Sequence, residues 1–165
     1  MDRISQIIDI IEKNPGIKFR EIMRETGMKN GVLSYHTKRL EESGNVKIER
    51  KSGETRFYPL FVTNEESIVI KSLRQETPRR ILLTLLDIEK ASFAVIVENV
   101  HKSSSTVSTY LSQLIENYIV DTKVVDLKKT YYIKNIDMVR EIIQKYSPAL
   151  LDRTAYSLAD TFSNL

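Results

Sequence analysis

Residues 32–44 read VLSYHTKRLEESG, and the fold prediction starts from this segment. Leu33 and Leu40 stand two helical turns apart, so both lie on one face of a helix. Gly44 follows them as a typical helix stop. The segment therefore predicts one helix with a buried apolar side and a polar side that faces solvent.

The neighbouring residues predict two more helices and a hairpin. Four isoleucines at helical spacing predict a first helix that ends at Asn14-Pro15-Gly16; they are Ile4, Ile7, Ile8 and Ile11. Phe19, Ile22 and Met23 predict a short second helix, which Gly27 stops. After Gly44, residues 46–50 alternate between apolar and polar side chains, as a half-buried strand does. A turn at 51–54 and a return strand at 55–60 complete the hairpin.

The same arrangement recurs later in the chain. A shift of 74 residues aligns apolar positions without a gap; the pairs include Leu33 with Val107, Ser34 with Ser108, Leu40 with Leu114 and Tyr58 with Tyr132. A repeat of this kind indicates two copies of one small unit. We predict domains at residues 1–62 and 63–135, followed by a helical tail at 136–165.

The composition excludes several classes of function. The 165 residues contain no Cys and only two His, so a zinc–thiolate or His-rich metal site is not expected, and no cofactor is predicted. No apolar run approaches the roughly 20 residues of a membrane span. No phosphate-binding Gly-rich loop and no hydrolase or metalloprotease motif is present, which argues against an enzyme. Because the amino terminus is amphipathic and is not a signal peptide, a cytoplasmic location is expected.

Residues 32–44, the hairpin Lys47–Tyr58 and the segment Ser104–Ser108 resemble winged helix-turn-helix transcriptional regulators of the broad ArsR/MarR kind, of archaeal type. The resemblance covers residues 1–62 well and 77–134 moderately. It implies a DNA-binding module that is commonly dimeric. The expected fold class is mostly α with small β-hairpins (α+β), with two tandem winged-helix domains plus C-terminal helices.

Helical geometry selects the residues that would meet double-stranded DNA. With Leu33 and Leu40 facing inward, the polar side of the helix carries the candidates for base edges, which are Asn30, Ser34 and Tyr35. Cations there and on the hairpin are candidates for phosphate contacts: Lys29, Lys38, Arg39, Arg50, Lys51 and Arg56. Residues 1–62 hold 12 basic and 9 acidic residues, whereas residues 63–165 hold 13 of each. The first domain is therefore the expected DNA reader.

The corresponding segment of the second domain is rich in hydroxyl groups. Its candidate secondary DNA contacts are Lys102, Ser104, Ser105, Ser108 and Thr109. Hydroxyls bind phosphate or bases but release no counterions, which are the main source of affinity for DNA. The segment is expected to make auxiliary contacts or to serve as a scaffold for dimerisation.

The tail carries a second candidate interface. Leu151, Ala155, Leu158 and Phe162 are spaced by four, three and four residues, as in a coiled-coil seam. This seam either forms a homodimer or packs on its own domain.

These features predict a sequence-specific, double-stranded DNA-binding transcriptional regulator that acts as a homodimer. The alternative is a tandem winged-helix subunit that binds protein in a transcription or chromosome-organising complex. Tandem winged helices also occur in membrane-sorting complexes, where they bind protein. A third possibility is a repressor that is controlled by a small apolar effector.

Overall fold

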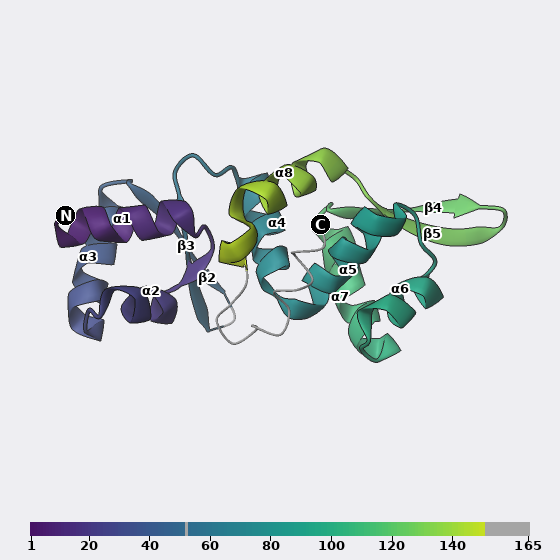
Figure 1. The fold of residues 1–165 in the computed structure, drawn as a ribbon, viewed down its shortest axis with the longest axis horizontal. Helices are drawn as coiled ribbons and strands as arrows, with labels where there is room; N and C mark the ends of the chain where they lie inside the picture. The colour runs from purple at the N-terminus through teal and green to yellow at the C-terminus, as the bar shows by residue number, and fades with distance from the viewer. Residues whose placement is uncertain (52, 151–165) are drawn as a thin grey trace. The chain divides into compact units, whose positions relative to one another are not determined.

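The computed structural model describes residues 1–51 and 53–150 (Figure 1). The chain divides into two compact units, Met1–Ser67 and Ile68–Leu165. The described residues are mainly helical and form two small antiparallel sheets, so the predicted α+β class is confirmed. Helix α4 (Asn64–Arg74) runs across the boundary between the units.

The first unit has the element order of a winged helix. Its elements are α1 (Arg3–Lys13), β1 (Ile17–Lys18), α2 (Phe19–Thr26), α3 (Asn30–Glu42), β2 (Val46–Lys51) and β3 (Glu54–Pro59). The predicted three helices and hairpin are all present. Strand β1 was not predicted; it pairs with β3, with Ile17 opposite Phe57, and adds a third strand to the sheet.

Local interactions define where the helices of this unit begin. The Asp2 carboxylate accepts a hydrogen bond of 2.7 Å from the Ser5 amide at the start of α1. Lys18 stands where a Ser or Thr cap is usual for α2. There the Glu21 carboxylate accepts a hydrogen bond of 3.3 Å from the Lys18 amide. The acidic side chain thus satisfies a backbone donor at the helix start.

One apolar core joins the helices of the first unit to its sheet. It contains Ile7, Ile11, Ile17, Ile22, Leu33, Leu40, Val46 and Phe57. Thr37 is also buried, and its hydroxyl donates a hydrogen bond of 2.9 Å to the Leu33 carbonyl. A polar side chain is therefore tolerated between Leu33 and Leu40, because its hydrogen-bonding capacity is used within the helix.

The second unit also contains three helices followed by a hairpin, and at the position of β1 it has an isolated bridge between Ala91 and Tyr131. After α4 come α5 (Glu76–Ile88), α6 (Phe93–Val100), α7 (Ser104–Glu116), β4 (Val120–Val125), β5 (Lys128–Ile133), α8 (Ile136–Tyr146) and a 3-10 helix (Ser147–Leu150). Ser92 and Ser103 cap α6 and α7, since their hydroxyls accept hydrogen bonds from the Val95 and Thr106 amides. Helix α5 begins earlier than the Thr77-Pro78 sequence suggests, with Gln75 as its N-cap. Pro78 fits because an amide in the first helical turn has no partner within the helix.

The predicted tail at residues 136–165 includes α8 and the 3-10 helix. Its dimerisation candidates Leu151, Ala155, Leu158 and Phe162 lie outside the described residues. None of the helices in the described ranges is long and apolar enough to cross a membrane.

Candidate nucleic-acid interface

Helix α3 holds the predicted base-reading residues on its solvent side. Burial of Leu33, Thr37 and Leu40 fixes the rotation of the helix, so Asn30, Ser34, Tyr35 and Lys38 are exposed with Lys29 just before it. The Ser34 hydroxyl donates a hydrogen bond of 3.2 Å to the Asn30 side-chain oxygen. These polar groups thus lie together on one helical face, as predicted.

Tyr35 and Arg39 form a pair one helical turn apart. The Arg39 guanidinium donates a hydrogen bond of 2.7 Å to the Tyr35 hydroxyl, and its carbon lies 5.6 Å from the centre of the ring. His36 is half-buried and contacts the Tyr35 ring edge-on, with 5.3 Å between ring centroids. The two neighbours restrict the Tyr35 ring, which lowers the entropy that Tyr35 would lose on binding.

The hairpin presents Lys51 to solvent, whereas Arg50 is already paired. Two hydrogen bonds of 2.9 and 2.7 Å join the Arg50 guanidinium to the Glu41 carboxylate of α3. The hydrogen bond from Arg50 is the main cause that holds the pKa of Glu41 below its usual range. Both side chains remain accessible, at 59% and 37% exposure. A phosphate would have to displace Glu41 to bind Arg50 with the same geometry.

Arg56 is not at this surface, and its prediction as a phosphate contact was wrong. The side chain is buried, with 1% of the residue exposed. Its guanidinium donates a hydrogen bond of 2.9 Å to the Gly16 carbonyl and lies 3.3 Å from the Glu54 carboxylate. Burial raises the pKa of Glu54, but the charges of Arg56 and Lys18 outweigh that effect, so the pKa lies below its usual value. Arg56 therefore joins β3 to the turn after α1.

The exposed faces of helix α3 and the hairpin line a common hollow of about 470 Å³. Asn30, Ser34 and Lys38 line it from the helix, and Arg50 and Thr55 line it from the hairpin. Four of the predicted contact residues, Asn30, Ser34, Lys38 and Arg50, therefore share one concave surface of the first unit. We call this surface the helix–wing groove.

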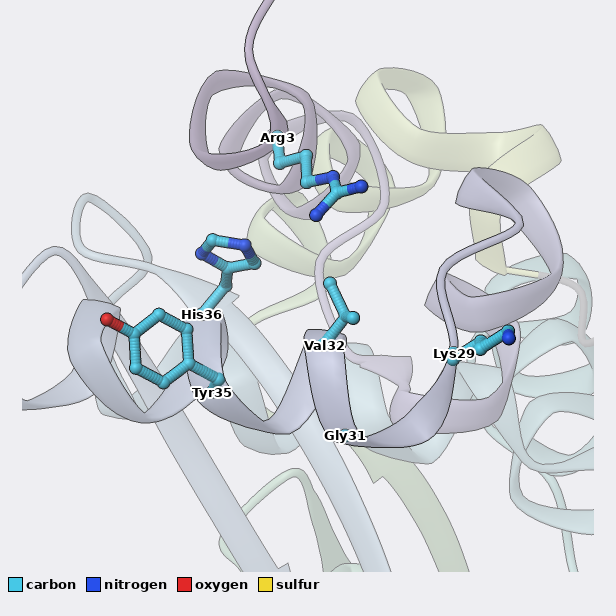
Figure 2. A pocket seen from close by; sticks show the side chains of 6 residues that line it. All are labelled: Arg3, Lys29, Gly31, Val32, Tyr35 and His36. Carbon is cyan, nitrogen blue, oxygen red and sulfur yellow. The ribbon is translucent and has the colours of Figure 1, made fainter.

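A second hollow, of about 650 Å³, lies on the other side of α3 and contains a cation that sequence reasoning missed. Figure 2 shows Arg3, Val32 and His36 pointing toward one another, while Lys29 and Tyr35 extend to either side. Arg3 comes from α1 and stands one helical turn before the buried Ile7. That spacing places Arg3 on the side of α1 that packs toward the core. The four-residue spacing from Ile7 is therefore the sequence signal that could have identified Arg3.

Helix α7 presents a neutral surface at the corresponding positions. Ser104, Ser105, Ser108 and Thr109 are all exposed, and the Thr109 hydroxyl donates to the Ser105 carbonyl at 3.0 Å. Lys102 is half-buried, and its ammonium lies 3.3 Å from the Glu76 carboxylate. The candidate secondary contacts thus include several hydroxyls and one cation that is already paired.

No group of three or more side chains suited to hold a metal occurs in the described part of the chain.

A family model described as an N-terminal HTH domain matches residues 1–69. This part of the chain is therefore similar to a helix-turn-helix domain, in agreement with the arrangement of α2 and α3. A comparison with curated proteins finds no match.

Two solved structures show a distant likeness. The crystal structure of the endosomal complex ESCRT-II (VPS22/VPS25/VPS36) is 13% identical, with a TM-score of 0.33, and the match covers 79% of this chain and 59% of that chain. The structure of the ESCRT-II endosomal trafficking complex is 11% identical, with a TM-score of 0.31, and coverage of 82% and 65%. The chain thus spans less than two thirds of either matched chain.

Proposed function

We propose that the protein is a sequence-specific, double-stranded DNA-binding transcriptional regulator, with α3 in the major groove and the β2–β3 hairpin on the phosphate backbone. The observation that carries the proposal is the helix–wing groove on a unit similar to an HTH domain. Asn30 and Ser34 provide hydrogen-bonding groups suited to base edges. Lys29, Lys38 and Lys51 are exposed, and none of them takes part in an ion pair with another described residue.

The finer parts of the proposal concern assembly. We propose that the two units are tandem winged helices of the ArsR/MarR-like, archaeal-type kind, and that the protein is cytoplasmic and not an enzyme. The seam Leu151, Ala155, Leu158 and Phe162 would form a homodimer that reads a palindromic site with half-sites about one helical turn apart. A small apolar effector remains compatible with this role.

A protein-interaction role is the second candidate, and it applies to the second unit. Its α7 surface is built from hydroxyl groups and lacks an unpaired cation among Lys102 to Thr109. Such a surface offers little of the counterion release on which affinity for DNA depends. In this alternative, the chain is a subunit of a transcription or chromosome-organising complex.

Selection from a random duplex pool, at low and near-physiological salt, tests the proposal. We expect enrichment of a palindrome that survives the higher salt, and loss of binding at the higher salt in a Lys38→Ala/Lys51→Ala variant. Lys13→Ala is the matched control, because Lys13 is exposed on α1 and paired with Asp9. Binding without enrichment would contradict sequence-specific regulation, and absence of binding would favour the protein-interaction role.

The homodimer is tested separately by the mass of the protein in solution. We expect a dimer for the full chain and a monomer for a chain that ends at Leu150. An unchanged mass after the truncation would exclude the seam as the dimer interface.

A further inference from the structure

The tip of the β4–β5 hairpin carries apolar side chains that the second unit does not cover. Leu127 is 99% exposed and is the most exposed large hydrophobic residue in the described part of the chain. Val124 is 69% exposed, and Val125 is also exposed. The hairpin extends away from the helices of its own unit (Figure 1). Exposed apolar side chains that gather at one end of an element are a common feature of binding surfaces.

The backbone of this tip is unfavourable for Leu127. Asp126 and Leu127 form the two-residue connection between the strands, with φ angles of +50° and +65°. Turns with positive φ at both positions favour Asn, Asp and Gly, because Cβ lies close to the backbone carbonyl in the left-handed region and most side chains do not offset that cost. The first hairpin has Gly53 at a φ of +74° near its own tip. Since Leu127 contributes almost no packing, folding alone gives no reason for a leucine there.

Three exposed lysines surround the apolar tip. The strand register places Lys128 opposite Val125 and Lys129 opposite Val124. Because side chains alternate along a strand, Lys123 and Lys128 share one face of the hairpin and Lys129 lies on the other. The Lys129 ammonium also lies 5.5 Å from the centre of the Tyr131 ring, which restricts its position. Cations thus flank the tip on both faces of the ribbon, and these three lysines outnumber the one exposed carboxylate of the turn, Asp126.

We propose that this tip is an apolar wedge that enters the minor groove of duplex DNA, with Leu127 against the base pairs and the lysines on the phosphates. A groove has a phosphate wall on each side, which complements cations on both faces of an inserted ribbon. Apolar side chains that enter from the minor groove unstack base steps and bend the duplex. This inference rests on the proposed function, and it gives the second unit a contact with DNA that does not use α7.

Binding and bending of an end-labelled duplex that carries the selected site test the wedge. Leu127→Asn removes the apolar side chain but keeps a residue that tolerates a positive φ. We expect the variant to melt at the same or a higher temperature, to lose the bend measured by energy transfer, and to bind about tenfold more weakly. Leu60→Asn is the matched control, since Leu60 is an exposed leucine of the first unit. It should bind and bend DNA as the parent does.

The salt dependence separates the two parts of the surface. Lys129→Ala should lower the slope of log affinity against log salt by about one, whereas Leu127→Asn should leave it unchanged. Parental binding and bending by Leu127→Asn would overturn the wedge, and the proposed function would stand if Lys38→Ala/Lys51→Ala still bound the selected duplex more weakly than the parent. If the parent protein binds no duplex, both proposals fall. Co-sedimentation with phosphatidylserine vesicles that Leu127→Asn abolishes would then assign the tip to a membrane surface and overturn the wedge.

Discussion

Helices α3 and α7 each have 13 residues and bury side chains at equivalent positions, yet their solvent sides differ in chemistry. The buried residues are Leu33, Thr37 and Leu40 in the first helix and Val107, Leu111 and Leu114 in the second. Outside these positions, α3 carries lysine, arginine, tyrosine and asparagine, whereas α7 carries mainly hydroxyl groups. Apolar spacing therefore specifies buried residues at the same positions twice, and the two helices differ in the residues that face solvent.

The two hairpins differ in a similar way. The first has Lys51 and Gly53 near its tip, and the second has Leu127 between Asp126 and Lys128. In the first, Arg56 is buried against the turn after α1; in the second, the equivalent position is Thr130, whose hydroxyl donates to the Lys123 carbonyl at 3.0 Å. A basic residue in the sequence of a hairpin is therefore not always exposed on the surface.

Arg56→Ala should have the largest effect on stability. The change removes a buried donor and leaves the Gly16 carbonyl without that partner, so we expect a loss of about 2 kcal/mol in the free energy of unfolding. The equivalent Thr130→Ala should cost under about 1 kcal/mol, because its hydrogen bond is exposed. Chemical denaturation measures the free energy of unfolding of both variants. If Arg56→Ala were as stable as the parent and its DNA binding depended less on salt, Arg56 would again be assigned as a phosphate contact.

Lys38→Ala should weaken binding to all duplexes several-fold. Loss of one phosphate contact lowers the slope of log affinity against log salt by about one. The residue 74 positions later is Ser112, which is exposed on α7, and Ser112→Ala should change neither quantity. Fluorescence anisotropy at several salt concentrations checks both variants. Equal slopes for the parent and Lys38→Ala would remove Lys38 from the interface.

Ser34→Ala should alter sequence preference at a cost of about 1 kcal/mol for the preferred base pair, because a hydroxyl near a base edge discriminates between bases. Ser108 is the identical residue in the second unit, so Ser108→Ala is a direct control. Competition with duplexes altered at single base pairs measures the preference. If only Ser108→Ala changed the base-pair preference, α7 and not α3 would be the helix that reads the bases.

Glu41→Gln should produce a small gain in affinity for any duplex. The change weakens the pairing of Arg50, which then becomes available to phosphate, so the salt slope should rise. Parental affinity in this variant would show that the Glu41–Arg50 pair does not limit binding.

The same pair predicts the weakest effect, on stability at acid pH. The folded-state pKa of Glu41 is lowered from its usual 4.5, so its contribution is complete above that value. It is lost as the pH falls through the lower folded-state pKa. Unfolding measured between pH 7 and 3 should show a small loss below about pH 4.5 in the parent that is absent from Glu41→Gln. Identical curves would contradict the pairing.

Regular spacing of apolar residues was sufficient to predict the helices and both hairpins. It could not predict β1, because Ile17 and Lys18 have no strand pattern of their own and depend on pairing with β3. Arg56 was misplaced for a related reason: its partner is the Gly16 carbonyl, 40 residues earlier, and only the folded chain brings them together. Residues on α3 were placed correctly because burial of Leu33 and Leu40 fixes which side of that helix meets solvent.

An amide chemical-shift titration of the full chain with the selected duplex tests the central claim most directly, because it observes both units at once. The account predicts the largest shifts along 29–38 and at Gly53 of the first unit, with a separate group at Leu127 and little change along α7. Shifts concentrated in α7, with α3 unaffected, would contradict the assignment of the first unit as the DNA reader.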